Sequence, residues 1–210
     1  MKQGENPHFF YAETVGGKYK MNAMKKILYI LLAIVVITIC FFYYVSYSFN
    51  QYIDNSNQND HMNISINENA PVKSSNQIEI QASIDTVWYM LTDIKNWTKW
   101  QTAITETIVD EKIEEGTNFK WKAGGLSFKS KIHTSKPNTA FGWTGTTIGA
   151  SAIHNWTFIK KDNNTTIVIV EESLQGLFPK LFKKYFQKNL DKGILTNLTE
   201  LKDASEMRIK

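Results

Sequence analysis

An uncharged apolar run from Ile27 to Phe49 constrains this chain more than any other feature of its sequence. Its 23 residues read ILYILLAIVVITICFFYYVSYSF. As a helix, the run would rise about 35 Å at ~1.5 Å per residue, which is enough to cross a hydrocarbon core of ~30 Å with some tilt. Tyrosines at 43, 44 and 47 cluster near one end, where amphipathic rings favour the membrane interface. We therefore expect one transmembrane helix over residues 27–49.

Three alternatives exist for this run. A buried core helix is one, although such helices rarely extend this far without a polar face. A cleaved signal peptide is another, but its apolar region is usually ~7–15 residues long and ends in small residues. The third is a lipoprotein processing site at Cys40, where the preceding Ile39 occupies a position that requires a small residue.

The charges on either side of the run predict its orientation. Lysines precede it closely and only acidic residues follow it closely: Lys18, Lys20, Lys25 and Lys26 come before, and Asp54, Asp60 and Glu68 come after. By the positive-inside rule, residues 1–26 form a cytoplasmic extension and everything after the span lies outside. Met1, Met21 and Met24 are each candidate starts, and Met24 directly precedes two of the lysines.

The remainder of the chain divides by composition. Residues 50–71 are dominated by Asn, Gln, Asp and Ser, which bury too little apolar surface to offset the entropy of ordering, so we expect a polar tether. Residues 72–206 contain the recurring aromatic and aliphatic positions of one domain. A net charge of +4 is too small to indicate nucleic-acid binding, and a single cysteine excludes an intramolecular disulfide.

Period-two alternation recurs through this domain and predicts strands. Turn residues such as Gly124-Gly125 and Lys136-Pro137-Asn138 separate the runs. The expected strands are residues 72–82, 104–111, 118–122, 126–135, 139–146, 151–160 and 165–174. Two short helices are expected between the first two strands, over about 85–91, with Ser83 or Asp85 as the cap, and over 94–100.

From Phe178 to Leu201 the apolar residues change to a spacing of three and four, and lysines occupy much of the other side. This pattern predicts one long amphipathic helix, eased at Gly193. A strand, two short helices, six strands and a long helix give an α+β fold. The simplest packing curls an antiparallel sheet around the final helix.

Several local sequences match one known family in order and spacing. They are Ile80-Gln81-Ala82-Ser83-Ile84-Asp85-Thr86-Val87-Trp88, the pair Trp97 and Trp100, Gly116-Thr117-Asn118-Phe119-Lys120-Trp121, Pro137 with Phe141-Gly142-Trp143, His154-Asn155-Trp156-Thr157-Phe158 and Glu172-Ser173-Leu174-Gln175-Gly176. Together they resemble the polyketide cyclase/START superfamily (SRPBCC proteins) over residues 72–206. One departure is Ser83, where relatives commonly have proline.

The resemblance implies the helix-grip fold, with a hydrophobic cavity between sheet and helix for a lipid, sterol, polyketide or other apolar molecule. It does not imply catalysis, because the family is mostly one of carriers and sensors without a shared catalytic motif. It implies no cofactor. The composition is typical of a bacterial protein, and the sequence leaves the oligomeric state open.

Strand parity gives a list of site residues that is independent of the family. One face of the sheet is apolar and aromatic, with Ser130, His154 and Glu172 as its few polar members, whereas the opposite face is rich in lysine. The candidate ligand-binding residues on this face are Trp121, Phe128, Ser130, Trp143, His154, Trp156 and Glu172. The aromatic members also suit ordinary core packing.

Three roles are open for His154 and Glu172: a structural pair, an anchor for the polar end of a ligand, or an acid/base pair. The other histidines, His8, His61 and His133, lie before the span, on the tether and on the outer face, so no metal site or nucleophile–base pair is expected. We expect a membrane-tethered, non-catalytic binder of an apolar or amphipathic small molecule. The alternative is a cyclase/dehydratase that uses His154 and Glu172.

Overall fold

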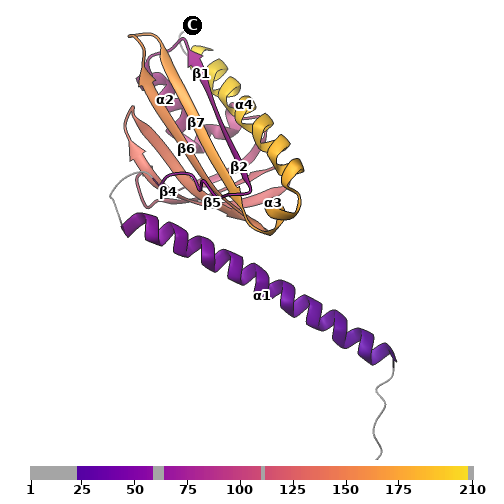
Figure 1. Ribbon diagram of the computed structural model, residues 1–210. Coiled ribbons are helices and arrows are strands. Elements are labelled where there is room, and N and C mark those ends of the chain that lie inside the picture. The colour runs from indigo at the N-terminus through magenta and orange to yellow at the C-terminus, as the bar shows by residue number, and fades with distance from the viewer. Residues whose placement is uncertain (1–22, 59–63, 110–111, 208–210) are drawn as a thin grey trace, which may run out of the picture. The chain divides into compact units, whose positions relative to one another are not determined.

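The computed structural model describes residues 23–58, 64–109 and 112–207 of the 210-residue chain. Figure 1 shows a curved sheet that lies beside a long C-terminal helix. The elements in chain order are α1 (Ala23–Gln58), β1 (Val72–Ile80), α2 (Ile84–Thr92), the 3-10 helix η1 (Ile94–Lys99), β2 (Ile104–Val109), β3 (Asn118–Ala123), β4 (Leu126–Lys136), β5 (Ala140–Thr147), β6 (Ala150–Lys160), β7 (Thr166–Gln175), α3 (Leu177–Leu181) and α4 (Lys183–Met207). This is the α+β order that the sequence predicts.

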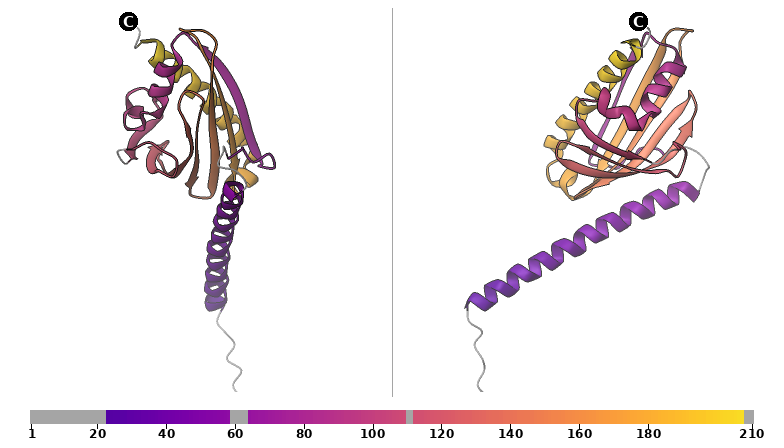
Figure 2. Two further views of the ribbon diagram at one scale, coloured as in Figure 1. Left: turned by 90° about the vertical axis from the view of Figure 1, so that its left-hand side faces the viewer. Right: turned by 180° about the vertical axis from the view of Figure 1, so that it is seen from behind.

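The seven strands form one antiparallel sheet in the order β1-β7-β6-β5-β4-β3-β2. Consecutive strands from β2 to β7 are neighbours in the sheet, and β1 joins the far edge by pairing with β7. At the turn between β3 and β4, both Gly124 and Gly125 have positive φ, a conformation that glycine adopts without a Cβ clash. The two views in Figure 2 show the sheet curving, with α2 and α4 on the same side of it.

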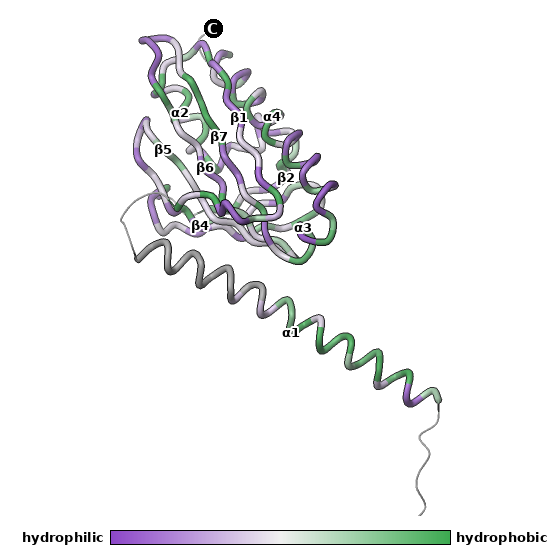
Figure 3. The backbone as a smooth tube through the Cα atoms, viewed as in Figure 1, coloured by the Kyte–Doolittle hydropathy of each residue, from purple (hydrophilic) through white to green (hydrophobic). Residues whose placement is uncertain are grey.

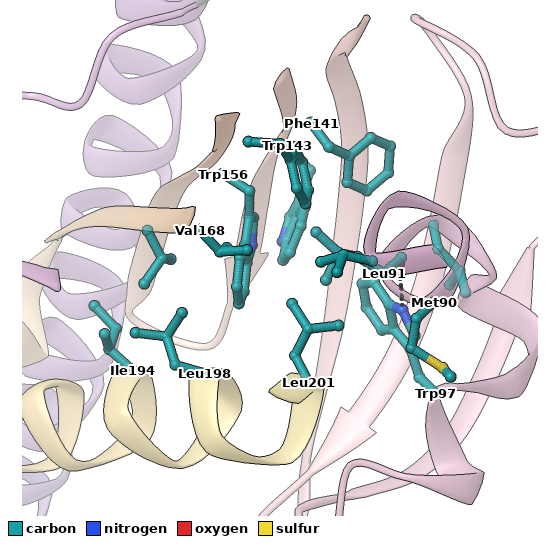
Figure 4. Close-up of a cluster of buried hydrophobic side chains, with 14 of the residues drawn as sticks. Met90, Leu91, Trp97, Phe141, Trp143, Trp156, Val168, Ile194, Leu198 and Leu201 are labelled. Atoms are coloured by element: carbon teal, nitrogen blue, oxygen red, sulfur yellow. Dashed lines mark hydrogen bonds between the residues drawn. The ribbon is translucent and has the colours of Figure 1, made fainter. Parts of the chain in front are cut away.

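The core forms where α4 packs on the concave face of the sheet. Figure 4 shows Trp156 and Val168 facing Ile194 and Leu198, while Leu201 lies closer to the side chains of α2 and η1. All five of these side chains are buried. Because every second residue of a strand points to the same face, this contact determines which residues of β5, β6 and β7 lie inside.

The short helix α2 begins where the sequence predicts. The Oγ of Ser83 accepts a hydrogen bond from the backbone N–H of Thr86, so this serine caps the helix. After it, the indole N–H of Trp97 in η1 donates to the Leu91 carbonyl over 2.7 Å. This buried bond holds the two short helices together at one end of the concave face.

The single helix expected over residues 178–201 is two helices in the structure. The first, α3, ends at Leu181, because Phe182 leaves the helical region with φ −115° and ψ 40°. The second, α4, continues through Gly193 without a break and extends to Met207, six residues beyond the predicted end. Gly193 therefore does not interrupt α4. The break between the two helices lies at Phe182, eleven residues earlier.

The N-terminal apolar helix and the tether also differ in extent from the expectation. The apolar window long enough to cross a membrane is Ala23–Tyr44, and none of it is buried in the structure. The helix α1 then continues to Gln58 through polar residues of the predicted tether. Its 36 residues rise about 54 Å, more than a hydrocarbon core of ~30 Å requires.

The last part of the predicted tether packs on the sheet. Ile64 is only 3% exposed and contacts Ile153, which points out of the convex face of β6. The amide of Asn155 donates to the Ile64 carbonyl, and the backbone N–H of Asn67 donates to Ser173 Oγ. Residues 64–70, which we call the strap, are therefore part of the domain rather than of a free linker.

We predict that the strap contributes measurably to folding stability. A fragment of residues 59–210 with Ile64→Ala should lose about 2 kcal/mol of unfolding free energy, the low end for removing a buried isoleucine, because the cluster around it is small. Urea unfolding at neutral pH measures the change. Ser65→Ala is the control, because Ser65 is exposed. Equal unfolding free energies for the two variants would show that the strap does not stabilise the domain.

Candidate ligand-binding site

His154 and Glu172 lie side by side on the concave face. They are register partners on β6 and β7, and Nδ1 of the imidazole is 2.9 Å from Oε2 of the carboxylate. Their side chains are 7% and 15% exposed. Because a carboxylate only accepts hydrogen bonds, the Nδ1–H donates, and Nε2 of a neutral imidazole is left as an acceptor. Both residues therefore lie on the face on which strand parity places them, and the structure brings them into contact.

Two indoles lie parallel to the His154 ring. Trp143, its register partner on β5, stacks on it with ring centroids 4.4 Å apart and planes 13° apart. Trp156, two residues along β6, stacks with centroids 5.3 Å apart and planes 14° apart. Three parallel rings thus form the inner wall of the concave face, and Figure 4 shows Trp143 and Trp156 directed to the same side of the sheet.

Two nitrogens of this stack have no hydrogen-bond partner in the described part of the chain. They are His154 Nε2 and Trp156 Nε1, and both are buried. Buried polar atoms are normally paired, and one left without a partner costs about 1–3 kcal/mol. Trp156 Nε1 can only donate, so whatever satisfies it must present an acceptor oxygen or nitrogen.

Trp121, Phe128 and Ser130 form a second group on the two strands β3 and β4. Trp121 and Phe128 are register partners whose rings stack with centroids 4.2 Å apart. The indole N–H of Trp121 donates to Ser130 Oγ over 3.0 Å. Trp121 and Phe128 are half-buried whereas Ser130 is buried, so this group forms a partly open edge of the same face.

A row of register partners runs from the second group across the sheet to β7, and its first three residues are small. Ser130 pairs with Gly145 on β5, Gly145 pairs with Ala152 on β6, and Ala152 pairs with Leu174 on β7. A Cβ at Gly145 would lie 3.1 Å from Ser130 Oγ, so the absence of a side chain at Gly145 leaves room for the Ser130 hydroxyl. Ala152 and Leu174 are half-buried. The predicted list missed Gly145, although it shares the strand parity of Phe141 and Trp143.

The concave face of the sheet is covered by side chains of α4 at one end and is less covered at the other. Next to Trp156, the side chains of Ile194 and Leu198 occupy the space between sheet and α4 (Figure 4). Among the described residues, the structure therefore does not show the large hydrophobic cavity that the resemblance implies. At the other end, Ala152 and Trp121 are only half-buried, so the face is less completely covered there.

Two pockets lie at the margins of the sheet. One of about 430 Å³ opens where β2, β3 and β4 meet, and its lining includes Phe119 and Ser130. The other, of about 240 Å³, lies between the strap and the convex face, and polar residues such as Thr134, Asn155 and Glu171 contribute to it. Each lining includes one predicted site residue, Ser130 in the first pocket and Trp156 in the second.

His133 lies on the convex face, as strand parity predicts, and it is half-buried rather than exposed. It sits at a register shift of β4 between Ile132 and Thr134, and its ring covers Gly142, where an added Cβ would lie 2.6 Å from His133 Cε1. Burial lowers the pKa of His133 from 6.5 to about 4. No group of three or more metal-ligating side chains occurs in the described ranges.

Comparisons with known proteins agree with this geometry. The family model described as polyketide cyclase / dehydrase and lipid transport matches residues 71–206. No curated protein matches the sequence. Many solved structures do, and all those described next are under 25% identical, so the likeness shows the fold.

Three of these structures illustrate the likeness. The hypothetical protein jhp0584 from Helicobacter pylori is 16% identical with a TM-score of 0.60, covering 69% of this chain and 98% of its own. The Zhui aromatase/cyclase from Streptomyces sp. R1128 is 12% identical with a TM-score of 0.59, covering 66% and 95%. A START superfamily protein from Mycobacterium smegmatis is 13% identical with a TM-score of 0.51, covering 65% and 95%. The helix-grip prediction is confirmed.

We predict a pH-dependent loss of stability that originates at His133. The unfolded chain takes up a proton as pH falls through about 6.5, whereas the folded state resists until about 4. The resulting loss of unfolding free energy is absent above pH 6.5 and grows as pH falls. It reaches at most about 3 kcal/mol, which corresponds to the lowering of the His133 pKa from 6.5 to about 4. NMR titration of the histidine ring protons should give a pKa of about 4, and His133→Gln should flatten the fall in unfolding free energy between pH 6.5 and 4. A titration near 6.5 would contradict the burial argument.

Proposed function

Because this chain belongs to the polyketide cyclase / dehydrase and lipid transport family, we propose that its domain holds one apolar or amphipathic small molecule beside a membrane without transforming it. The observation that carries the proposal is the pair of buried nitrogens, His154 Nε2 and Trp156 Nε1, on a wall of stacked aromatic rings. A ligand oxygen that accepts from Trp156 and bonds His154 would satisfy both at once.

The arrangement favours a neutral polar end on the ligand. Glu172 accepts from His154 Nδ1 and is itself mostly buried, so a carboxylate placed at Nε2 would bring a second negative charge into the same enclosed space. A hydroxyl or carbonyl oxygen avoids this repulsion. The body of the ligand would then lie over Ser130, Gly145 and Ala152, toward the half-buried rings of Trp121 and Phe128.

A specific observation also favours a catalytic function. The imidazole is oriented through Nδ1 by a carboxylate and keeps Nε2 free, which is the arrangement of a general acid or base. Aromatase/cyclases are among the similar structures. In this second candidate, His154 moves a proton in a cyclisation or dehydration, and Glu172 holds the imidazole in the required tautomer.

We predict that the fragment of residues 59–210 retains a small molecule that native mass spectrometry detects. His154→Ala should weaken its binding by about 1–3 kcal/mol, the cost of leaving a buried partner unsatisfied, and should change folding stability less. His133→Ala, on the opposite face of the sheet, is the matched control. It should leave affinity per folded molecule unchanged.

The same experiment separates the candidates. If the pair is structural, His154→Ala and Glu172→Gln lower the melting temperature, and affinity follows the folded fraction alone. If the protein is an enzyme, the retained molecule changes on incubation, for example by losing one water, and His154→Ala stops the change. Retention of the unchanged molecule, weakened by His154→Ala, supports the carrier.

We propose further that α1 is a single membrane span, with the amino terminus in the cytoplasm and the domain outside. Lys18 and Lys20 precede the apolar window Ala23–Tyr44, and Lys25 and Lys26 lie in its first turn, before the uncharged run that begins at Ile27. Protease added to intact cells should therefore digest the domain of the expressed chain. Full protection of an intact, membrane-bound chain would reverse the orientation. Release of a domain that lacks the apolar window would mean a signal sequence instead.

A further inference from the structure

A group of apolar side chains around α3 is exposed on the surface of the domain. Leu181 is 63% exposed, Phe182 56% and Tyr185 68%. Phenylalanine and leucine are normally buried, and three such residues within five positions make a local patch rather than scattered exposure. In Figure 3 the chain around α3 carries the hydrophobic colour.

The turn between β5 and β6 extends this patch. Its Ile148 is 68% exposed. The turn is held against α3, because the N–H of Phe178 donates to the Gly149 carbonyl over 3.1 Å and the ring of Phe178 would lie 2.7 Å from a Cβ at Gly149. Gly149 also has a φ of +68°, so both its conformation and this close approach require glycine. The turn that carries Ile148 is therefore fixed against α3.

Positive charge surrounds these apolar residues. The lysines of the segment are all exposed: Lys180, Lys183, Lys184 and Lys188. No aspartate or glutamate occurs between Glu172 and Asp191 in the sequence. The lysine ion pairs within the described ranges involve four other lysines, Lys73, Lys122, Lys161 and Lys202. The charge around α3 is thus not neutralised within the described part of the protein.

We propose that this surface, formed by Ile148, Leu181, Phe182 and Tyr185 with the four lysines, docks on an anionic membrane. Aromatic and aliphatic residues flanked by lysine suit the boundary between acyl chains and charged headgroups. A protein partner fits less well, because lysine is depleted from the centres of protein interfaces. The chain also carries a helix apolar enough to cross a bilayer, which would keep a membrane within reach of this surface.

The docking surface adjoins the open end of the concave face. The helix α3 follows β7 directly, and Leu174 near the end of β7 belongs to the row with Ala152 and Gly145. If the proposed function holds, docking turns the mouth of the ligand site toward lipid. The docking itself does not depend on a ligand, so its test can fail or succeed independently of the proposed function.

The test uses the full-length chain in vesicles, with Cys40→Ser and a single nitroxide attached through Tyr185→Cys. Vesicles contain phosphatidylglycerol and phosphatidylcholine in equal parts, or phosphatidylcholine alone. In the anionic vesicles, the ratio of nitroxide collisions with oxygen to collisions with a water-soluble nickel complex should rise severalfold. The matched control is the same label through Asn164→Cys, on the exposed turn between β6 and β7 at the other end of the sheet. This label should remain water-accessible in both vesicles.

Charge reversal tests the role of the lysines. A triple variant tests this: Lys180→Glu, Lys183→Glu and Lys184→Glu. In anionic vesicles it should lower the oxygen-to-nickel collision ratio of the Tyr185→Cys label to the value of a water-exposed label. Substitution of the same three lysines by arginine should leave the ratio high. An aqueous ratio in anionic vesicles overturns the proposal. Burial that is equal in neutral vesicles and insensitive to charge reversal also overturns it. Spin–spin broadening that persists in detergent would show that a second copy of the chain covers this surface, and would equally overturn it.

Discussion

The packing of α4 against the concave face of the sheet is the interaction on which the other features of this domain depend. It buries Trp156, Val168 and Val170 against Ile194 and Leu198, and thereby decides which parity of each strand faces inward. His154 and Glu172 share that parity, so the same contact that excludes water from the core also encloses an imidazole and a carboxylate. Their hydrogen bond, the stacked indoles and the two nitrogens that lack a partner among the described residues all follow from this enclosure.

Most of the domain could be predicted because its strands alternate cleanly and glycine, asparagine and aspartate mark the turns. The features that escaped prediction depend on contacts between distant segments. Ile64 lies among polar residues and gives no periodic signal, yet it is buried because Ile153 projects from the convex face. The shift at Ile132 in β4 leaves the pattern of alternation intact in the sequence, so only the pairing with β5 reveals it.

The candidate site was predicted in its members but not in its shape. Parity correctly placed Trp143, His154 and Trp156 on one face, since it depends only on the period of a strand. It favoured large side chains, and therefore overlooked Gly145, whose contribution is the space it leaves. It also gave no means of distinguishing aromatic rings that fill the core from rings that line a hollow, because this depends on how closely α4 approaches each strand.

The strap has a mechanical consequence. Any tension between the amino-terminal helix and the domain passes along the chain to Ile64 before it reaches the edge strand β1. Pulled directly at Val72, β1 would separate from β7 one residue pair at a time, the least resistant geometry for an antiparallel edge. The strap instead transfers the load to β6, in the interior of the sheet, through Ile153 and the amide of Asn155. Force along the chain is therefore distributed over several strands, and the hydrogen bonds between β1 and β7 are protected from it.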